Sequence, residues 1–315
     1  MGTFFWKYKW LFLMLFLFPW FFIGGPDYES PRLFKEAWNF GHILFFAIFT
    51  LETMRYSKAT DASTRQRYIT IMLLVIVLAI SIEVCQSLLT ERNASTRDII
   101  FDFAGGFVVL AWQYHGQNSP KRKIFFRTSG SALVFLCMLP FILTTVDEYR
   151  AWRDFPVLSD FESFLDVSRW QGNGGIKRVK QPVKSGTFSL MATLTADKYS
   201  GVTLNHFPPN WSDAQALTFS VYNPGEPVVL NYRVHDQNHL EKYQNYSDRF
   251  NGQATLRPGW NILTIGMGDI ENAPKNRKMD IQHIRGLGVF VAGQPVQRVL
   301  YIDDVKLLMT KPGSD

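Results

Sequence analysis

Ionisable side chains stand at or just inside the ends of apolar segments in the first half of the chain. The group consists of His42, Glu83, Gln86, Arg92, Arg97, Asp98 and Asp102. Glu83 and Gln86 are three residues apart and Asp98 and Asp102 are four apart, so each pair would project from one face of a helix. A histidine with two carboxylates can carry acid/base chemistry or bind a cation, whereas arginines can pair with a phosphate.

Placing these polar residues in a membrane would cost free energy unless they lined a common site. An ionised side chain at the centre of a bilayer costs about 2.5 to 3.5 kcal/mol, so it normally faces a bundle interior or an aqueous cavity. We therefore expect His42, Glu83 and Asp102 to converge on a pocket for a lipid headgroup, with Arg92 and Arg97 on its phosphate. The alternative is that they are interfacial residues at helix ends. The sequence shows no nucleophile elbow, HExxH motif or phosphate-binding glycine loop.

The elements that would position these residues are apolar segments. Five uncharged runs fill the first half: Trp10 to Pro26, Ala37 to Leu51, Tyr68 to Ile82, Phe103 to Pro120 and Thr128 to Val146. A membrane helix needs roughly 20 apolar residues, so residues 1–150 are predicted to form an all-α bundle of five transmembrane helices. Lys and Arg gather in alternate connecting segments, which places the N-terminus in the cytoplasm and residues after Asp147 outside.

Two segments of this half carry a recognisable pattern. The pattern comprises NFGH at Asn39 to His42, followed by Glu83, Gln86, Arg92, Ser95, Asp98 and Gly105. Over approximately residues 7 to 115 it resembles the VanZ-like membrane proteins. That family usually has Asp where Asn39 stands and Asn where Asp102 stands. The resemblance implies a bacterial envelope protein in the inner (plasma) membrane.

The second half has the pattern of an all-β domain. From Val157 onward, short alternating or β-branched runs recur between turn signals: LTFSVYNPGEP, VVLNYRVHD, QATLRPGWNILTI, GLGVFVAG and RVLYIDDVKLLM. Such spacing predicts an antiparallel sandwich over residues 151–315. Cys85 and Cys137 both fall in the predicted membrane helices, so no disulfide is expected. The net charge is +6, but the sequence shows no clustered basic face, which argues against a nucleic-acid partner.

Several motifs of this half are similar to those of one known class of β-sandwich. They are FES at Phe161 to Ser163, the NPGEP turn, RVHD, SDRF, NGQATLRPGWN, RGLGVFV and YIDDVKL. Over about residues 158 to 309 they resemble carbohydrate-binding-module-like jelly rolls of the galactose-binding superfamily. Such jelly rolls often carry a structural calcium ion where the first and last strands meet. Glu162 and Asp303 match those ends and are the candidate calcium ligands; no other cofactor is expected.

A sugar site needs an aromatic platform and polar groups for hydroxyls. Alternation in VVLNYRVHD places Arg233 and His235 on one sheet face, and the apolar Leu230 and Val234 on the core face. Further candidates are Asp248 and Arg249 in a turn, and Trp211 and Tyr243 in loops. Trp211 could instead plug the sandwich edge, and Arg233 with Asp248 could form only a structural ion pair.

Together these patterns favour a membrane protein that recognises an envelope glycolipid or polysaccharide precursor. Its partners would be a membrane lipid or lipid-linked glycan and a polysaccharide. One rival is an enzyme acting on a lipid-linked phosphate or glycan, with His42, Glu83 and Asp102 as acid/base groups. The other is a membrane scaffold whose sandwich binds a protein partner.

Overall fold

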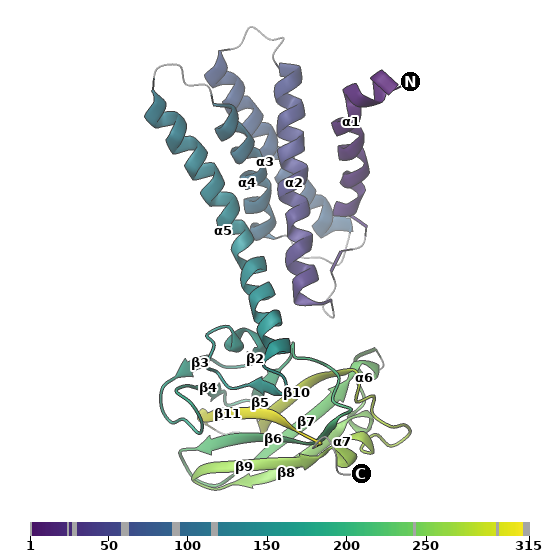
Figure 1. Ribbon diagram of the computed structural model, residues 1–315, viewed down its shortest axis with the longest axis vertical. Coiled ribbons are helices and arrows are strands. Elements are labelled where there is room, and N and C mark those ends of the chain that lie inside the picture. Colours follow the sequence, from purple (N-terminus) through teal and green to yellow (C-terminus); the bar gives the residue numbers. More distant parts are fainter. Residues whose placement is uncertain are drawn as a thin grey trace. The chain divides into compact units, whose positions relative to one another are not determined.

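The chain folds into two compact units, Met1–Thr145 and Val146–Asp315. The computed structural model describes residues 2–23, 25–26, 30–57, 63–89, 95–114, 119–241, 244–293 and 296–310. The first unit is helical and the second consists mainly of strands (Figure 1). The division falls inside one long helix, α5 (Pro120–Arg153), whose last turns belong to the second unit.

Within the described residues, a helix covers most of each of the five predicted apolar runs. The helices are α1 (Gly2–Leu17) with the short 3₁₀ helix η1 (Phe18–Phe21), α2 (Arg32–Tyr56), α3 (Thr64–Leu89), α4 (Thr96–Gln113) and α5. Helix α4 begins where the Ser95 hydroxyl accepts the backbone N–H of Asp98 at 3.3 Å, an N-cap. Helices α2 and α4 can pack closely because Gly105 has no side chain. A Cβ at that position would lie 2.3 Å from the carbonyl oxygen of Ile43.

The prediction of five transmembrane helices is wrong in number. Among the described residues only two helices, Thr64–Leu88 and Pro120–Arg153, are long and apolar enough to cross a membrane, and Tyr8–Phe21 is a shorter apolar helix. Helices α2 and α4 fall short because charged residues interrupt them: α2 contains Glu52 and Arg55, and α4 contains Asp98 and Asp102. Uncharged runs therefore overstated how many helices have a membrane-spanning composition.

The second unit is a sandwich of two antiparallel sheets, as the sequence predicts. Sheet A has the order β3-β4-β11-β6-β9, with β1 pairing to β11, and sheet B has the order β2-β5-β10-β7-β8 (Figure 1). The strands are β1 (Val157–Ser159), β2 (Trp170–Gly172), β3 (Ile176–Val179), β4 (Ser189–Leu194), β5 (Tyr199–Leu204), β6 (Ala214–Asn223), β7 (Val228–Asp236), β8 (Phe250–Leu256), β9 (Gly259–Gly266), β10 (Ile284–Ala292) and β11 (Arg298–Met309).

Short helical turns complete this unit. They are η3 (Asp166–Arg169), α6 (Gln237–Glu241), η4 (Tyr246–Asp248) and α7 (Met267–Glu271). Strand alternation explains the core between the sheets, because every second side chain points inward. Leu190 and Leu217 of sheet A meet Leu230 and Leu287 of sheet B there, and all four are fully buried.

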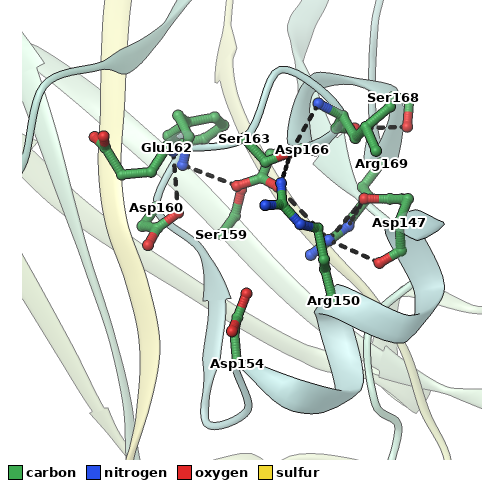
Figure 2. Close-up of polar contacts among 12 residues, drawn as sticks. Asp147, Arg150, Asp154, Ser159, Asp160, Glu162, Ser163, Asp166, Ser168 and Arg169 are labelled. Atoms are coloured by element: carbon green, nitrogen blue, oxygen red, sulfur yellow. Dashed lines mark hydrogen bonds and ion pairs between the residues drawn. The ribbon is translucent and has the colours of Figure 1, made fainter. Parts of the chain in front are cut away.

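A buried ionic network ties the end of α5 to the segment before β2 (Figure 2). The Arg169 guanidinium donates to the Asp147 carboxylate at 2.7 and 2.9 Å and lies 3.5 Å from Asp166. Arg150 donates to the Ser163 hydroxyl at 2.9 Å. Burial raises the pKa of Asp166 to about 6, although its carboxylate also accepts the backbone N–H of Phe161. The end of α5 is thus an integral part of the second unit.

Candidate functional site

The outward face of sheet B gathers aromatic and hydrogen-bonding side chains. The members discussed below are Tyr199 and Thr203 of β5, Asn231, Arg233 and His235 of β7, Asn251 and Gln253 of β8, and Phe290 of β10. We call this set the sheet-B face. Its members alternate along each strand with core residues such as Leu230 and Val234, which have no exposed surface. The predicted alternation of β7 therefore holds.

Glycines of β10 let two of these side chains lie flat on the sheet. In the strand register Gly286 pairs with His235, and Gly288 pairs with Arg233. A Cβ at Gly286 would lie 2.4 Å from Cε1 of His235, and one at Gly288 would lie 2.7 Å from Nε of Arg233. The imidazole and the guanidinium stem therefore occupy the space above β10 that ordinary side chains would fill. They form a polar floor for the face.

An aromatic pair stands beside this floor. The rings of Tyr199 and Phe290 are 6.2 Å apart with an interplanar angle of 70°, and Tyr199 is 56% exposed. The Arg233 guanidinium lies 5.9 Å from the Phe290 ring centroid. An exposed aromatic ring presents a flat apolar surface next to a cationic hydrogen-bond donor. Because the two rings are steeply inclined, one of them, the exposed Tyr199, can stack on a flat ligand while Phe290 supports it from the side.

Two buried nitrogen atoms of the floor have no hydrogen-bond partner within the described part of the chain. They are Nε of Arg233 and Nδ1 of His235. Nδ1 of the neighbouring His239 in α6 lies 3.7 Å from Oδ2 of Asp248. His235 is only 8% exposed, and its ring lies 5.4 Å from that of His239. Burial and the nearby cations lower the pKa of His235 to about 3, so this imidazole is neutral at physiological pH. Unpaired buried polar atoms are rare and often mark a place for a ligand.

Amide side chains border the floor on β7 and β8. Asn231 accepts from Gln253 at 2.8 Å across the two strands. Asn251 accepts from Nε of Arg249 at 3.0 Å and donates to the carbonyl of Tyr246 at 2.8 Å. Because these bonds hold the amides and Arg249 in position, their remaining donors and acceptors are oriented before a ligand arrives.

Asp248 has a supporting role rather than a place on the floor. Its carboxylate accepts two hydrogen bonds from Arg277, at 2.7 and 2.9 Å. The same guanidinium donates to Asp236 at 2.5 and 2.8 Å. Arg277, which the sequence analysis missed, thereby joins η4 to the end of β7 and holds the pKa of Asp248 below its usual range. The alternative pairing of Asp248 with Arg233 is not the one formed.

Trp211 does not contribute to the face. Its side chain has no exposed surface, its ring lies 5.4 Å from that of Phe207, and its Nε1 donates to the carbonyl of Pro208 at 3.2 Å. The expectation that Trp211 stacks on a ligand is wrong, because the ring fills the core. Tyr243, the other loop aromatic, lies outside the described residues, as does Arg92.

The two candidate calcium ligands accept hydrogen bonds from the backbone of one turn. Glu162 accepts the backbone N–H groups of Thr187 and Phe188 at 2.7 and 3.0 Å. Asp303 accepts those of two further residues of the same turn, Lys184 and Ser185, at 2.7 and 3.1 Å. Calcium takes six to eight oxygen ligands, backbone carbonyls included, and no group of three or more His, Cys, Asp or Glu side chains that could hold a metal occurs in the described ranges. Calcium binding by Glu162 and Asp303 stays a prediction.

The helical unit brings part of its predicted polar cluster together. Nδ1 of His42 lies 2.8 Å from Oδ1 of Asp102, and both side chains are buried. Glu83, also buried, accepts the backbone N–H of Ser95 at 2.6 Å, and Gln86 donates to the carbonyl of Phe21 at 2.8 Å. Helices α2, α3 and α4 therefore each contribute a polar group to the bundle interior.

The outer members of this cluster have other partners. Arg97 forms an ion pair with Glu36 of α2, with one contact of 3.2 Å, and lies 5.2 Å from the Phe101 ring centroid. Asp98 sits in the first turn of α4, where a carboxylate complements the helix dipole. The structure thus gives Arg97 a partner within the protein in place of the expected phosphate.

Comparisons with known proteins bear on the sandwich only. No family model matches the chain, and no curated protein matches it. The VanZ-like resemblance of the helical half therefore stays a prediction. Similar solved structures include a family 11 carbohydrate-binding module from Clostridium thermocellum in complex with a β-1,3-1,4-mixed-linked tetrasaccharide, at 16% identity and TM-score 0.38, covering 49% of this chain and 95% of that one.

Two further structures extend the comparison. The CBM22-1 xylan-binding domain from Paenibacillus barcinonensis Xyn10C shows 14% identity and TM-score 0.34 over 49% of this chain and 93% of that one. An exo-β-agarase shows 13% identity and TM-score 0.38 over 50% of this chain and 26% of that one. Likenesses this distant decide nothing about the ligand of this chain, so the function must be argued from the sheet-B face.

Proposed function

We propose that the sandwich binds a glycan on the sheet-B face. The observation that carries this proposal is the floor made by Arg233 and His235, whose buried nitrogens lack partners, beside the exposed ring of Tyr199 and the half-buried ring of Phe290. A sugar ring offers an apolar C–H face for stacking and hydroxyls at its edge for hydrogen bonds. Its hydroxyls would hydrogen-bond to the polar side chains around the floor, and its flat face would cover the exposed Tyr199 ring.

The helical unit anchors this glycan-binding protein in a membrane under the same proposal. Helix α3 exposes Leu73, Val77 and Ile80, and α5 exposes Phe125 and Leu136. Exposed apolar side chains along long helices are favourable in lipid and costly in water. We place the protein in a bacterial inner membrane with the sandwich outside the cytoplasm, recognising an envelope glycolipid or polysaccharide precursor.

A binding experiment on the full chain tests the glycan proposal. The protein is held in lipid nanodiscs, which avoid sugar-headed detergents, screened on a glycan array and titrated with the best oligosaccharide. Tyr199→Ala and Phe290→Ala should each weaken binding about fivefold, because an aromatic contact is worth roughly 1 kcal/mol.

Trp260→Ala is the matched control. Trp260 lies on sheet A, where its ring packs 5.4 Å from that of Tyr222, so the variant should bind like the wild type. Absence of glycan binding by the wild type would refute the proposal and favour a protein-binding scaffold. Loss of binding in Trp260→Ala alone would move the site to the other sheet.

A second candidate function, lipid-headgroup binding, concerns the helical unit. Oδ2 of Asp102 and Oε1 of Glu83 are buried and lack hydrogen-bond partners within the described residues. Two free carboxylate oxygens favour a ligand that donates hydrogen bonds, such as the hydroxyl or ammonium group of a lipid headgroup. The His42–Asp102 pair also has the composition of an acid/base pair, which keeps the enzyme alternative open.

Lipid analysis of purified protein tests the headgroup proposal. Glu83→Gln should lower the amount of a specific co-purifying lipid, whereas Ser87→Ala, an exposed position on the same helix, should not. Equal lipid recovery from both variants and the wild type would contradict the proposal. If the wild type turned over a polyprenyl-linked substrate and His42→Ala did not, the protein would be an enzyme instead.

A further inference from the structure

The sheet-B face has cations and no acidic residue. Its outward positions on the five strands comprise Gln171, Tyr199, Gly201, Thr203, Val229, Asn231, Arg233, His235, Asn251, Gln253, Thr255, Gly286, Gly288, Phe290 and Ala292. None of these is Asp or Glu, and Arg249 precedes β8 at the same end of the face. A face built only for neutral sugar hydroxyls commonly needs acceptors as well as donors. Here the charged groups are all donors.

The two guanidiniums of the face lack carboxylate partners. Arg233 forms no ion pair within the described residues, and Arg249 donates to the neutral amide of Asn251. The nearest acidic residues in the network, Asp236 and Asp248, are both taken by Arg277. The arginine count on the face therefore exceeds its carboxylate count, and the excess positive charge is left for a ligand.

This excess charge is costly in the absence of a ligand. Burial lowers the pKa of Arg233, and burial together with the charge of Arg233 lowers the pKa of Arg249. Both shifts mean that the cationic forms are less favourable here than in water. A partly buried charge without a partner is stabilised most by an opposite charge that arrives with its own oxygen acceptors.

We infer that the sheet-B face selects glycans with anionic sugar units, bearing carboxylate or sulfate groups, and that Arg233 with Arg249 pairs with the anion. The inference rests on the proposed glycan function and names the substrate class. The stacking pair fits this class, because Arg233 lies 5.9 Å from the ring centroid of Phe290. A sugar stacked on that pair would bring a ring substituent to the guanidinium, whose planar donors match an oxyanion in a bidentate manner.

The neutral imidazole of His235 beside the arginines contributes to affinity without adding to the charge of the face. With a pKa of about 3, His235 adds no charge at physiological pH and leaves a buried Nδ1 for a sugar hydroxyl. His235 therefore adds nothing to the positive charge that Arg233 and Arg249 supply. Substituting an arginine should consequently change the preference for anionic glycans, while substituting His235 should change overall affinity.

Titrations of the full chain in zwitterionic nanodiscs test the inference. The probes are polygalacturonate, dextran sulfate, neutral galactan and neutral dextran, so that carboxylate and sulfate are compared separately with matched neutral chains. We expect at least one anionic glycan to bind about tenfold or more tightly than its neutral counterpart, and the difference to shrink as salt rises. Arg233→Gln and Arg249→Gln should each reduce this preference severalfold, and Arg233→Lys should keep part of it.

Lys177→Gln controls for general attraction by the basic chain. Lys177 is exposed on β3 of sheet A, so its loss should leave the preference unchanged. Equal affinity for anionic and neutral glycans, or an undiminished preference in a correctly folded Arg233→Gln variant, would overturn the inference while leaving glycan binding intact. Binding of no glycan at all would instead refute the proposed function, and the inference with it.

Discussion

At the scale of single residues, His235 shows how burial sets chemistry. Its ring lies against Gly286, between the cations Arg233 and Arg249, and only 8% of it is exposed. These surroundings favour the neutral imidazole, which can offer one donor and one acceptor. Removing it from water while leaving Nδ1 unpaired costs free energy, which a bound hydroxyl would recover.

The pH dependence of folding tests this account of His235. Its pKa of about 3 in the folded protein lies below the pKa of 6.5 that histidine has in an unfolded chain, so its stabilising contribution is complete well above pH 6.5 and declines as pH falls toward 3. Between pH 6.5 and 5 the loss should be about 2 kcal/mol. His235→Gln, which cannot titrate, should lack this component.

Thermal melts at several pH values provide the measurement. Circular dichroism of the strands follows unfolding of the sandwich. The stability of the wild type relative to His235→Gln should fall as pH drops from 6.5 to 5. Parallel curves for the two proteins over that range would show that His235 titrates normally.

The sequence indicated part of this residue-level detail. Strict alternation in β7 placed Arg233 and His235 correctly, because a strand with one buried face has a period of two. Trp211 was misjudged because a loop tryptophan has no periodicity to show which way it points. Phe290 was overlooked although GLGVFVAG contains a signal: Leu287 and Val289 alternate with two glycines and this phenylalanine.

At the scale of elements, strand β10 determines the shape of the face. Gly286 and Gly288 provide room for the side chains of β7 to lie across their neighbour. Bulkier residues would raise those side chains and remove the floor. A glycine in a strand interior weakens the strand, which is consistent with a place where another group must approach closely.

Gly288→Ala is the direct test of this element. The new Cβ would lie 2.7 Å from Nε and 2.9 Å from Cγ of Arg233, so the arginine side chain must move. Because a flexible side chain moves more easily than backbone, we expect a stability change below about 1 kcal/mol and a severalfold loss of glycan affinity. Calorimetric titration and a thermal melt measure the two effects.

Gly268→Ala provides the comparison. A Cβ at Gly268 in α7 meets nothing within 4 Å, so this variant should retain wild-type affinity. If both glycine variants bind equally well, the flat position of Arg233 is irrelevant to binding.

The helical elements show a different limit of sequence reasoning. Helices cover most of each apolar run, but among the described residues only α3 and α5 have the length and composition of a membrane span. An apolar run ends at the first charged residue, whereas a membrane span depends on the mean hydropathy of about 19 consecutive residues, charged ones included. The contact between His42 and Asp102 was expected from their shared depth, while the ion pair of Arg97 with Glu36 depends on the packing of α2 against α4.

At the scale of the whole molecule, the chain combines a helical unit and a β-sandwich with separate cores. The helical unit exposes apolar side chains, for which we propose lipid as the surroundings, and the sandwich exposes a cationic, aromatic face, for which we propose sugar as the ligand. The sequence predicted this division because apolar composition changes sharply near residue 146. Which face of the sandwich is functional required the register of the strands, since composition does not reveal it.

The central claim is that glycan lies across β5, β7 and β10. Photolabelling the full chain in nanodiscs with a diazirine-bearing oligosaccharide of the best-binding class, followed by peptide mapping, measures this directly. The account predicts labels within Tyr199–Leu204, Val228–Asp236 and Ile284–Ala292, removed by excess unlabelled glycan. Competed labels confined to Gly259–Gly266 of sheet A, or to the helical unit, would contradict it.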